Sequence, residues 1–188
     1  MSTEMLLIVG VAVAVVVIAI VIYNGLVSGQ AQVRNSWSQI DVQLKRRHDL
    51  IPNLVNSVKG AMDFEKSTLT SVVEARNRAV SAKSPQEAMA AENALTGALG
   101  RFMAVAEAYP QLRSQEGVTS LMEELKSTEN KIAFARQHYN DAVQGQNIRV
   151  ASFPGVIFAR LFGFAPETLF QVPEAEHAAI ETAPEVKL

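Results

Sequence analysis

The chain has 188 residues, a formal net charge of −2 and no cysteine. This length suggests one domain together with an anchor or a tail. The lack of cysteine excludes disulfides, thiolate metal ligands and a thiol nucleophile, and the nearly balanced charge disfavours general nucleic-acid binding.

The first predicted element is an uncharged apolar run, MLLIVGVAVAVVVIAIVIY, at residues 5–23. As a helix, this run would span about 28 Å, close to the ~30 Å hydrocarbon core of a bilayer. Tyr23 ends the run, where an aromatic ring suits the membrane interface. A cleaved signal peptide is the alternative, but no Lys or Arg precedes the run, and the run is long for a signal peptide. The sequence therefore predicts a single-span anchor at residues 1–23.

Positive charge predicts the orientation of this anchor. Lys and Arg are absent before the run, whereas Arg34, Lys45, Arg46 and Arg47 follow it. Because cytoplasmic flanks carry the excess of basic residues, we expect the soluble part to lie in the cytoplasm. The opposite, extracytoplasmic placement is the alternative.

Residues 24–150 show helical periodicity, without β-type alternation beyond a few residues. One helix is expected from about Asn24 to Gly60 or beyond, and a second from about Phe64 to Ala82. The apolar stripe of the first consists of Trp37, Ile40, Leu44, Ile51, Leu54, Val55, Val58, Ala61 and Met62. The second continues with Leu69, Val72, Val73, Ala79 and Val80.

A third helix is predicted to begin at Ser84. Ser84 can cap it, Pro85 fits its first position, Glu87 completes a capping box, and Pro110 ends it. Its apolar seam is Ala88, Ala91, Leu95, Ala98, Phe102, Val105 and Tyr109. A fourth helix carries Val118, Leu121, Leu125, Thr128, Ile132, Ala135, Tyr139 and Ala142 at the same spacing. These seams predict an all-α fold, with a long antiparallel bundle of three to four helices after the anchor.

The stretch DVQLKRRHDLIP, residues 41–52, carries clustered charge within the first bundle helix. Successive helical positions rotate by about 100°, so Lys45, Arg46 and Arg47 point in different directions, and we expect two of them to face solvent. Asp41 and His48 lie beside the apolar stripe. They are expected to be either satisfied structural polar groups or a partner-docking or proton-sensitive spot.

Pro52 predicts a local defect in the same helix. It has no N–H, so the carbonyl of His48 loses its usual helical partner and the helix should bend there. Because Ile51 would be a poor N-cap, one bent helix is preferred to two separate helices.

Sequence motifs for catalysis or metal binding are not found. A di-metal bundle needs inward-facing E-x-x-H motifs, and the only E-x-x-H runs from Glu174 to His177 in the tail. His138 has Phe134 and Ala135 where a further ligand would be needed. Phosphate-loop, dinucleotide-binding and nucleophile-elbow signatures are also missing. We therefore expect no catalytic, cofactor or metal site, no nucleic-acid partner and no evident small-molecule substrate.

A hydrophobic hook is predicted at residues 151–170. The stretch from 151 to 173 holds five phenylalanines, but prolines, glycines and Arg160 interrupt it, so it cannot span a membrane. It is expected to fold back over one end of the bundle. The alternatives are an exposed partner-binding segment or an interfacial membrane contact. Residues 171–188 carry four Glu against one Lys and predict a disordered acidic tail.

Six stretches carry a family likeness. They are YNGLV at 23–27, W-S-x-I-D-V-Q-L-K-R-R-H-D-L-I-P-N-L-V at 37–55, EARN at 74–77, EELKSTENKIAFAR at 123–136, HYNDAV at 138–143 and SFPGVIFARLFGF at 152–164. Together they resemble the LemA family, in order from about residue 5 to 170. The resemblance implies a bacterial inner-membrane protein with one N-terminal span and a helical bundle, and it carries over no catalytic residue.

The chain departs from the family pattern just after the span. Many relatives look more basic there, whereas this chain has Gly25, Ser28, Gly29 and Gln30. This composition suggests a more flexible joint between anchor and bundle.

Polar residues within the family motifs suggest a network between helices. Glu74, Arg76, Asn77, Glu129, Asn130 and Arg136 form the hypothesised network of charge-assisted hydrogen bonds. Ordinary surface pairing along single helices is the alternative. The full set of candidate structural or partner-binding positions is Asp41, Arg46, Arg47, His48, Asp49, Pro52, Asn53, Glu74, Arg76, Asn77, Glu129, Asn130, Arg136, Tyr139, Asn140, Phe153 and Pro154.

These features predict a membrane-anchored, non-catalytic scaffold or assembly module, with copies of itself or another membrane protein as partner. The alternative is a regulatory adaptor that binds a membrane enzyme, protease or signalling protein. A scaffold should form large homo-oligomers, whereas an adaptor should form a defined heteromeric complex. An enzyme is the least supported class.

Overall fold

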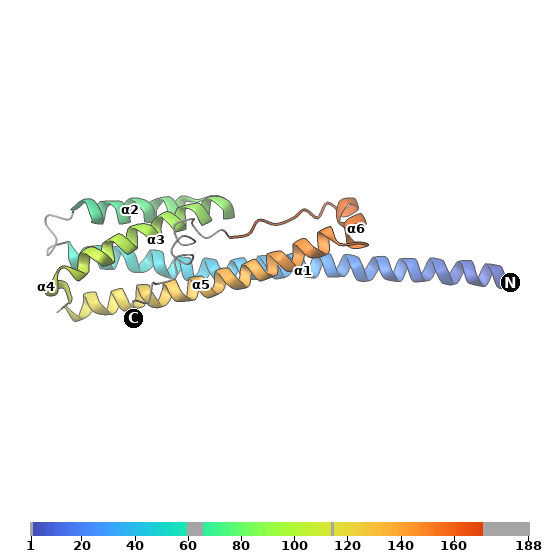
Figure 1. The fold of residues 1–188 in the computed structure, drawn as a ribbon, viewed down its shortest axis with the longest axis horizontal. Coiled ribbons are helices and arrows are strands. Elements are labelled where there is room, and N and C mark those ends of the chain that lie inside the picture. Colours follow the sequence, from blue (N-terminus) through green and yellow to red (C-terminus); the bar gives the residue numbers. More distant parts are fainter. Residues whose placement is uncertain (1, 60–65, 114, 171–188) are drawn as a thin grey trace, which may run out of the picture. The chain divides into compact units, whose positions relative to one another are not determined.

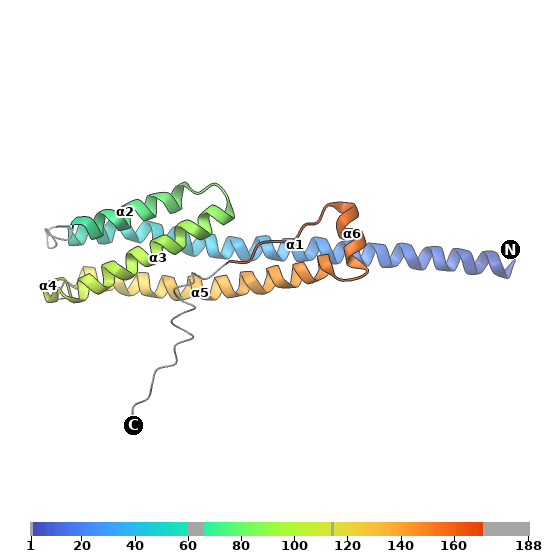
Figure 2. The ribbon, with the colours of Figure 1, turned by 45° about the horizontal axis from the view of Figure 1, so that its top comes forward.

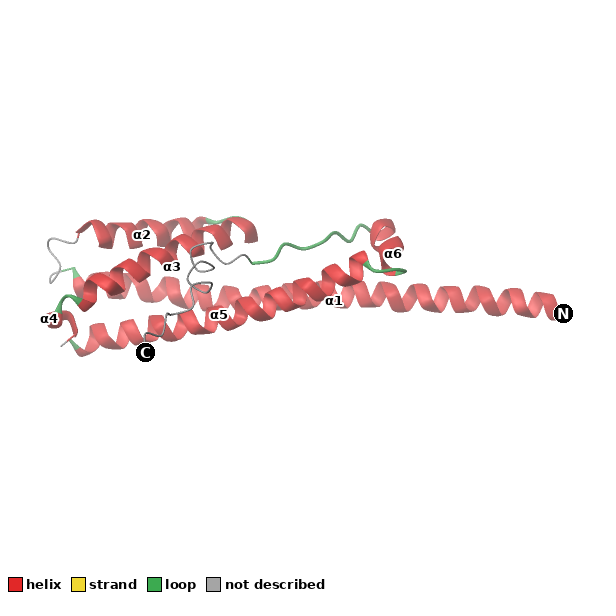
Figure 3. Ribbon diagram, viewed as in Figure 1, coloured by secondary structure: helices red, strands yellow, loops and turns green. Residues whose placement is uncertain are grey.

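The computed structural model describes residues 2–59, 66–113 and 115–170. Every regular element in these ranges is a helix, which confirms the all-α prediction (Figures 1 and 3). The helices are α1 (Thr3–Val58), α2 (Lys66–Ser81), α3 (Pro85–Glu107), α4 (Pro110–Arg113), α5 (Glu116–Ala151) and α6 (Gly155–Phe162). The expectations for Ala61, Met62 and the acidic tail, including its E-x-x-H motif, fall outside the described residues.

The chain divides into two compact units, and α1 and α5 contribute to both. Met1–Ile40 and Phe134–Leu169 form the first, called here the anchor unit. The described residues of Asp41–Ala133, together with Phe170, form the second, called the bundle unit.

The apolar run lies in α1 and is not covered by other parts of the chain. Its large apolar side chains between Met5 and Val21 are 46% to 69% exposed. Among the described residues this is the one helix long and apolar enough to cross a membrane. Exposing so much apolar surface to water is unfavourable, and a lipid environment removes that cost.

The expected flexible joint after the run is wrong. Helix α1 continues through Gly25 and Gly29 without interruption. Gly29 is buried, and a Cβ at this position would collide with the side-chain ends of Gln146 and Arg149 from α5. The glycine therefore leaves room for the ends of these two side chains against α1 and does not form a hinge.

Neutral contacts hold the anchor unit together. The side-chain amide of Gln146 donates to the carbonyl of Leu26 at 3.2 Å, and the rings of Trp37 and Tyr139 meet edge to face at 5.5 Å. The Tyr139 hydroxyl donates to the Thr168 carbonyl at 3.0 Å. Burial raises the pKa of this phenol, and the nearby charge of Glu167 raises it further, so the group stays protonated and able to donate at neutral pH.

The hydrophobic hook packs on α1 and α5 within the anchor unit. Ala159 of α6 is buried against Leu26 and Val150, with Phe158 and Phe164 packed around them. Helix α6 begins at Gly155, which has no side chain. A Cβ at this position would collide with the carbonyl oxygen of Arg149. The extended segment after α6 is connected to α5 by two hydrogen bonds. The Asn147 side chain donates to the Glu167 carbonyl at 2.9 Å and accepts from the Glu167 N–H at 2.7 Å.

The bundle unit has an apolar core to which α1, α2, α3, α4 and α5 contribute side chains. Its fully buried large members are Ile51, Leu54, Val58, Val72, Leu95, Phe102, Leu112 and Val118. Helices α2 and α3 form an antiparallel pair (Figure 2). The predicted cap of α3 is confirmed: the Glu87 N–H donates to the Ser84 hydroxyl at 3.2 Å, and the Glu87 carboxylate accepts from the Lys83 N–H at 2.9 Å.

Two predicted apolar seams are partly wrong. Val73 and Val80 lie on the exposed side of α2. In α3 the buried face consists of Met89, Glu92, Leu95, Ala98, Leu99, Phe102 and Ala106. The predicted members Ala88, Ala91, Val105 and Tyr109 are only half-buried. The core thus meets α3 along a face rotated from the predicted one, and that face includes a glutamate.

Candidate functional site

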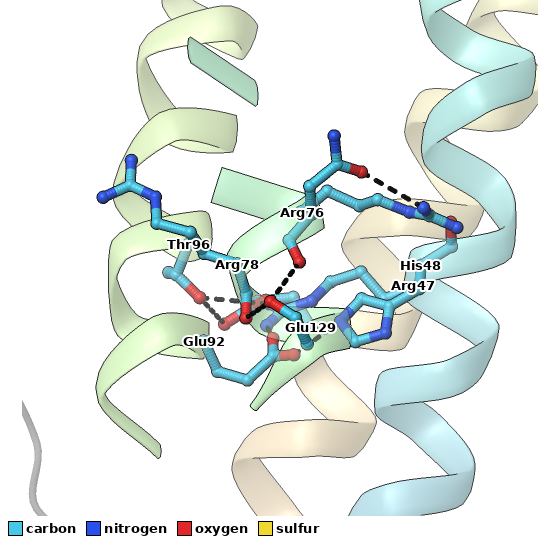
Figure 4. A network of polar contacts seen from close by, with 9 residues as sticks. Arg47, His48, Arg76, Arg78, Glu92, Thr96 and Glu129 are labelled. Atoms are coloured by element: carbon cyan, nitrogen blue, oxygen red, sulfur yellow. Dashed lines mark hydrogen bonds and ion pairs between the residues drawn. The ribbon is translucent and has the colours of Figure 1, made fainter. Parts of the chain in front are cut away.

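The bundle unit contains a cluster of charged side chains in its interior (Figure 4). We call it the Arg47 cluster, and its members are Arg47 and His48 of α1, Glu92 and Thr96 of α3, and Glu129 of α5. Arg47 is 0% and Glu92 1% exposed. Such burial of two charges is tolerated only when they are paired and hydrogen-bonded.

Arg47 is the centre of the cluster. Its Nη2 donates to Glu92, and its Nη1 donates both to Glu129 and, at 3.0 Å, to the Thr96 hydroxyl. The Thr96 hydroxyl in turn lies 3.4 Å from the other oxygen of Glu129, to which it donates. The guanidinium therefore links three helices through one planar fork of donors.

His48 completes the coordination of the Glu92 carboxylate. Its Nε2 lies 2.5 Å from Glu92 Oε1, while Arg47 occupies the other oxygen. Burial alone raises the pKa of Glu92. The hydrogen bond with His48 and the charge and hydrogen bond of Arg47 together outweigh that effect, so the pKa of Glu92 is lowered below its ordinary value. Glu92 is consequently an ionised, buried partner of Arg47 at neutral pH.

The helical register explains why Arg47 is inside while its neighbours are not. Arg47 lies three positions after Leu44 and four before Ile51, so it occupies a place in the apolar stripe. Lys45 and Arg46 face solvent, and Arg46 pairs loosely with Glu124 at 3.6 Å. The prediction that two of these three basic residues would be solvated is confirmed.

The defect at Pro52 is met by another helix. The His48 carbonyl, which Pro52 leaves without a helical donor, accepts a hydrogen bond from Arg76 Nε of α2 at 3.3 Å. Helix α1 accordingly runs through Pro52 as a single element, as preferred from the sequence. A positive side chain at this carbonyl also adds to the contacts that fix α2 against α1.

The remaining predicted positions are divided between surface and interior. Asp41, Asp49, Asn53, Glu74, Asn77 and Asn130 are exposed. The expected place of Asp41 beside the core is therefore wrong. Asn77 accepts from Arg76 at 3.3 Å. Arg136, Asn140 and Pro154 are half-buried, Tyr139 is buried, and Phe153 is exposed.

Sequence reasoning missed Glu92 and Thr96. The signal for Glu92 was present, because it lies three positions after Met89 and three before Leu95, in line with the buried face of α3. A charged residue at an apolar position predicts a buried partner of opposite charge. Glu92, Glu129 and His48 are residue types that bind metal ions, but here Arg47 donates to both carboxylates and His48 contacts the other oxygen of Glu92. No group of potential metal ligands occurs among the described residues.

A second feature is an open groove beside this cluster. It lies between α3 and α5, has a volume of about 590 Å³, and is lined partly by Met103 and Met122. Gly100 forms part of its wall, and Glu129 and Thr96 reach it from the Arg47 cluster. Methionine side chains adapt their shape to different apolar partners.

Comparison with known proteins identifies related chains. The sequence model of the LemA family matches residues 36–187. The magnetosome protein MamQ 2 of Paramagnetospirillum magneticum is 26% identical over 186 residues, which cover 85% of this chain and 68% of the relative. The protein LemA of Metamycoplasma hominis is 24% identical over 164 residues, which cover 85% of this chain and 74% of the relative.

Removal of the Arg47 side chain should destabilise the bundle unit strongly. Arg47→Ala leaves the Glu92 carboxylate buried without its cation, and we expect a loss of about 3–5 kcal/mol in the free energy of unfolding. Arg46→Ala is the matched control, because this neighbouring arginine is half-exposed and its pair should contribute at most about 1 kcal/mol. Urea unfolding of the full-length protein in detergent, followed by its helical circular dichroism, measures both.

A double replacement separates the missing pair from a general loss of packing. Arg47→Met with Glu92→Leu removes the fully buried pair and fills the space, while the partly exposed Glu129 can be hydrated. The double variant should therefore recover most of the stability lost in Arg47→Ala. Equal losses for Arg47→Ala and Arg46→Ala would contradict the structural importance of the cluster.

Acid should weaken the folded state through Glu92. Because the pKa of Glu92 is lower in the folded state than its ordinary value of 4.5, its ionised pair stabilises the fold fully above that value. This contribution is lost as the pH falls through the folded-state pKa. In unfolding measured between roughly pH 5 and pH 3, Glu92→Gln should show a shallower dependence on pH than the parent protein. Glu124→Gln, which changes the exposed pair with Arg46, is the control and should keep the pH dependence of the parent protein. An unchanged pH dependence in Glu92→Gln would contradict the role of Glu92 as a buried, ionised partner of Arg47.

Proposed function

The chain belongs to the LemA family, and we propose that it is a non-catalytic scaffold or assembly module of the bacterial inner membrane. Residues 1–23 would anchor it by a single span, and the bundle would lie in the cytoplasm. Its partner would be further copies of itself or another membrane protein.

The Arg47 cluster is the observation that carries the non-catalytic part of this proposal. Glu92, Glu129 and His48 are the side chains of the cluster suited to proton transfer. Each is hydrogen-bonded within the cluster, Glu92 to His48 and Arg47, and Glu129 to Arg47 and Thr96. A carboxylate held ionised by both Arg47 and His48 is committed to a structural ion pair, and its lowered pKa makes it a poor general acid near neutral pH. The titratable side chains of the Arg47 cluster therefore support a role in folding rather than in catalysis.

Membrane attachment supports an assembly role. A tethered protein is confined to two dimensions, so its effective concentration is raised and even weak contacts between copies can be populated. The relatives named as magnetosome proteins are consistent with this role, since their names refer to a cellular structure and not to a reaction.

The adaptor alternative rests on the groove between α3 and α5. An amphipathic helix of a partner could place apolar side chains against Met103 and Met122, with Lys126 and Glu123 available at the margin. The shape and lining fit the helix-in-groove mode of recognition, in which affinity depends on a few apolar anchors.

The mass of the native particle distinguishes the two roles. We expect full-length protein, gently extracted from its own membrane, to give large assemblies of this chain alone in native mass analysis. A defined particle with a second protein would replace the scaffold by the adaptor, and a monomer of this chain alone would contradict both.

Filling the groove adds a control to the same measurement. Gly100→Leu projects a side chain into the groove, whereas Gly97→Leu lies on the same helix outside the groove lining, and neither position has a neighbour that an added Cβ would strike. A heteromeric particle that uses the groove should be lost only with Gly100→Leu. Homo-oligomers that do not depend on the groove should survive both changes.

Labelling from outside the cell tests the proposed orientation. The chain has no cysteine, so Ser120→Cys creates a single exposed thiol in α5. In intact cells this thiol should stay unlabelled by a membrane-impermeant maleimide and should react after the cells are opened. Val27→Cys, close to the end of the apolar run, provides a second position on the same side of the span. Labelling of Ser120→Cys in intact cells would place the bundle outside the cytoplasm.

A further inference from the structure

Helix α6 presents an apolar face that the rest of the anchor unit does not cover. Phe153 is 81% and Leu161 72% exposed, and Ile157 and Phe162 are also more than half exposed. Ile157 and Leu161 are four positions apart, so they lie on one side of the helix. A cluster of four large apolar side chains on an eight-residue helix and its entry turn is unusual for a surface in contact with water.

This face lies beside the end of the apolar run. The ring of Tyr23, the last residue of the run, meets Phe162 at 4.9 Å and Phe164 at 6.0 Å, edge to face in both pairs. Both ribbon views place α6 against α1 at this level (Figures 1 and 2). Tyrosine at the end of a span favours the headgroup region. The aromatic contacts therefore place α6 at the depth where the run meets water.

The sequence of α6 fits a lipid surface better than a protein partner. Arg160 is exposed next to the apolar face, and Glu167 is the only acidic residue between 151 and 170. Long basic side chains reach lipid phosphates while their apolar stems stay among the acyl chains. The partly exposed ring of Phe162 also contacts Tyr23, at the end of the exposed apolar surface of α1 that the proposed span would place in lipid.

We propose that α6 is an interfacial helix that lies in the headgroup region of the leaflet from which α1 emerges. Ile157, Leu161 and Phe153 insert toward the acyl chains, and Arg160 contacts lipid phosphate. Because α6 is packed on Leu26 and Tyr23, this second contact fixes the depth and tilt of α1 in the bilayer. The inference rests on the proposed membrane span.

Single spin labels on the otherwise cysteine-free, full-length chain test this placement. Ile157→Cys and Leu161→Cys report on α6, Val13→Cys reports on the span, and Phe134→Cys is an exposed apolar position on α5 outside the hook. Each labelled protein is reconstituted in vesicles of phosphatidylcholine and phosphatidylglycerol. Collision with oxygen, which concentrates in lipid, is compared with collision with a water-soluble nickel chelate.

Labels at Ile157 and Leu161 should collide more often with oxygen and less often with the nickel chelate than the label at Phe134 does. The label at Val13 should show the same difference more strongly. Water-like values at Ile157 and Leu161 with a lipid-like Val13 would overturn the interfacial helix and leave the span intact. A water-like Val13 would overturn the span as well. Dipolar broadening at Leu161 that disappears on dilution with unlabelled protein, together with low collision rates for both reagents, would assign the face to a second copy of the chain.

Discussion

The buried guanidinium of Arg47 is the constraint on which the bundle unit depends. A charge without solvent must find partners, and here they come from two other helices, Glu92 from α3 and Glu129 from α5. A slip of either helix by one residue would leave at least one ion unpaired in the core, at a cost of several kcal/mol. Apolar contacts alone discriminate registers weakly, so the cluster acts as the specific element in a core that is otherwise formed by interchangeable aliphatic side chains.

The same region shows how a local defect is absorbed by tertiary structure. Pro52 removes one hydrogen bond from α1 only four residues after His48, whose ring is bound to Glu92 and whose carbonyl is bound to Arg76. His48 thus contacts α3 through its side chain and α2 through its backbone. Together with the forked contacts of Arg47, two adjacent residues connect α1 to the three other long helices, which explains why charge is concentrated in this short stretch of sequence.

Periodicity and capping rules predicted the helices well because both are local. The stripe through Leu44, Ile51 and Val58 and the cap at Ser84 could be read directly from spacing. The partners of Arg47 could not, since nothing local states which face of α3 meets α1, and the predicted seam of α3 was rotated away from Glu92. Gly29 was misjudged for the same reason: its composition indicates flexibility, but its role is set by Gln146 and Arg149, more than a hundred positions later in the chain.

The two units differ in the kind of polar side chain that they bury completely. In the anchor unit, two buried side chains make neutral hydrogen bonds: the amide of Gln146 donates to the Leu26 carbonyl, and the Tyr139 phenol, whose pKa is raised, donates to the Thr168 carbonyl. Neutral donors lose far less on entering a low-dielectric environment than ions do. The ionised cluster occurs instead in the bundle unit, where Glu129 is still partly exposed to solvent. Among the described residues, the charged side chains that are buried as a whole, Arg47 and Glu92, both lie in the bundle unit, so full burial of charge coincides with the unit whose register the ion pairs specify.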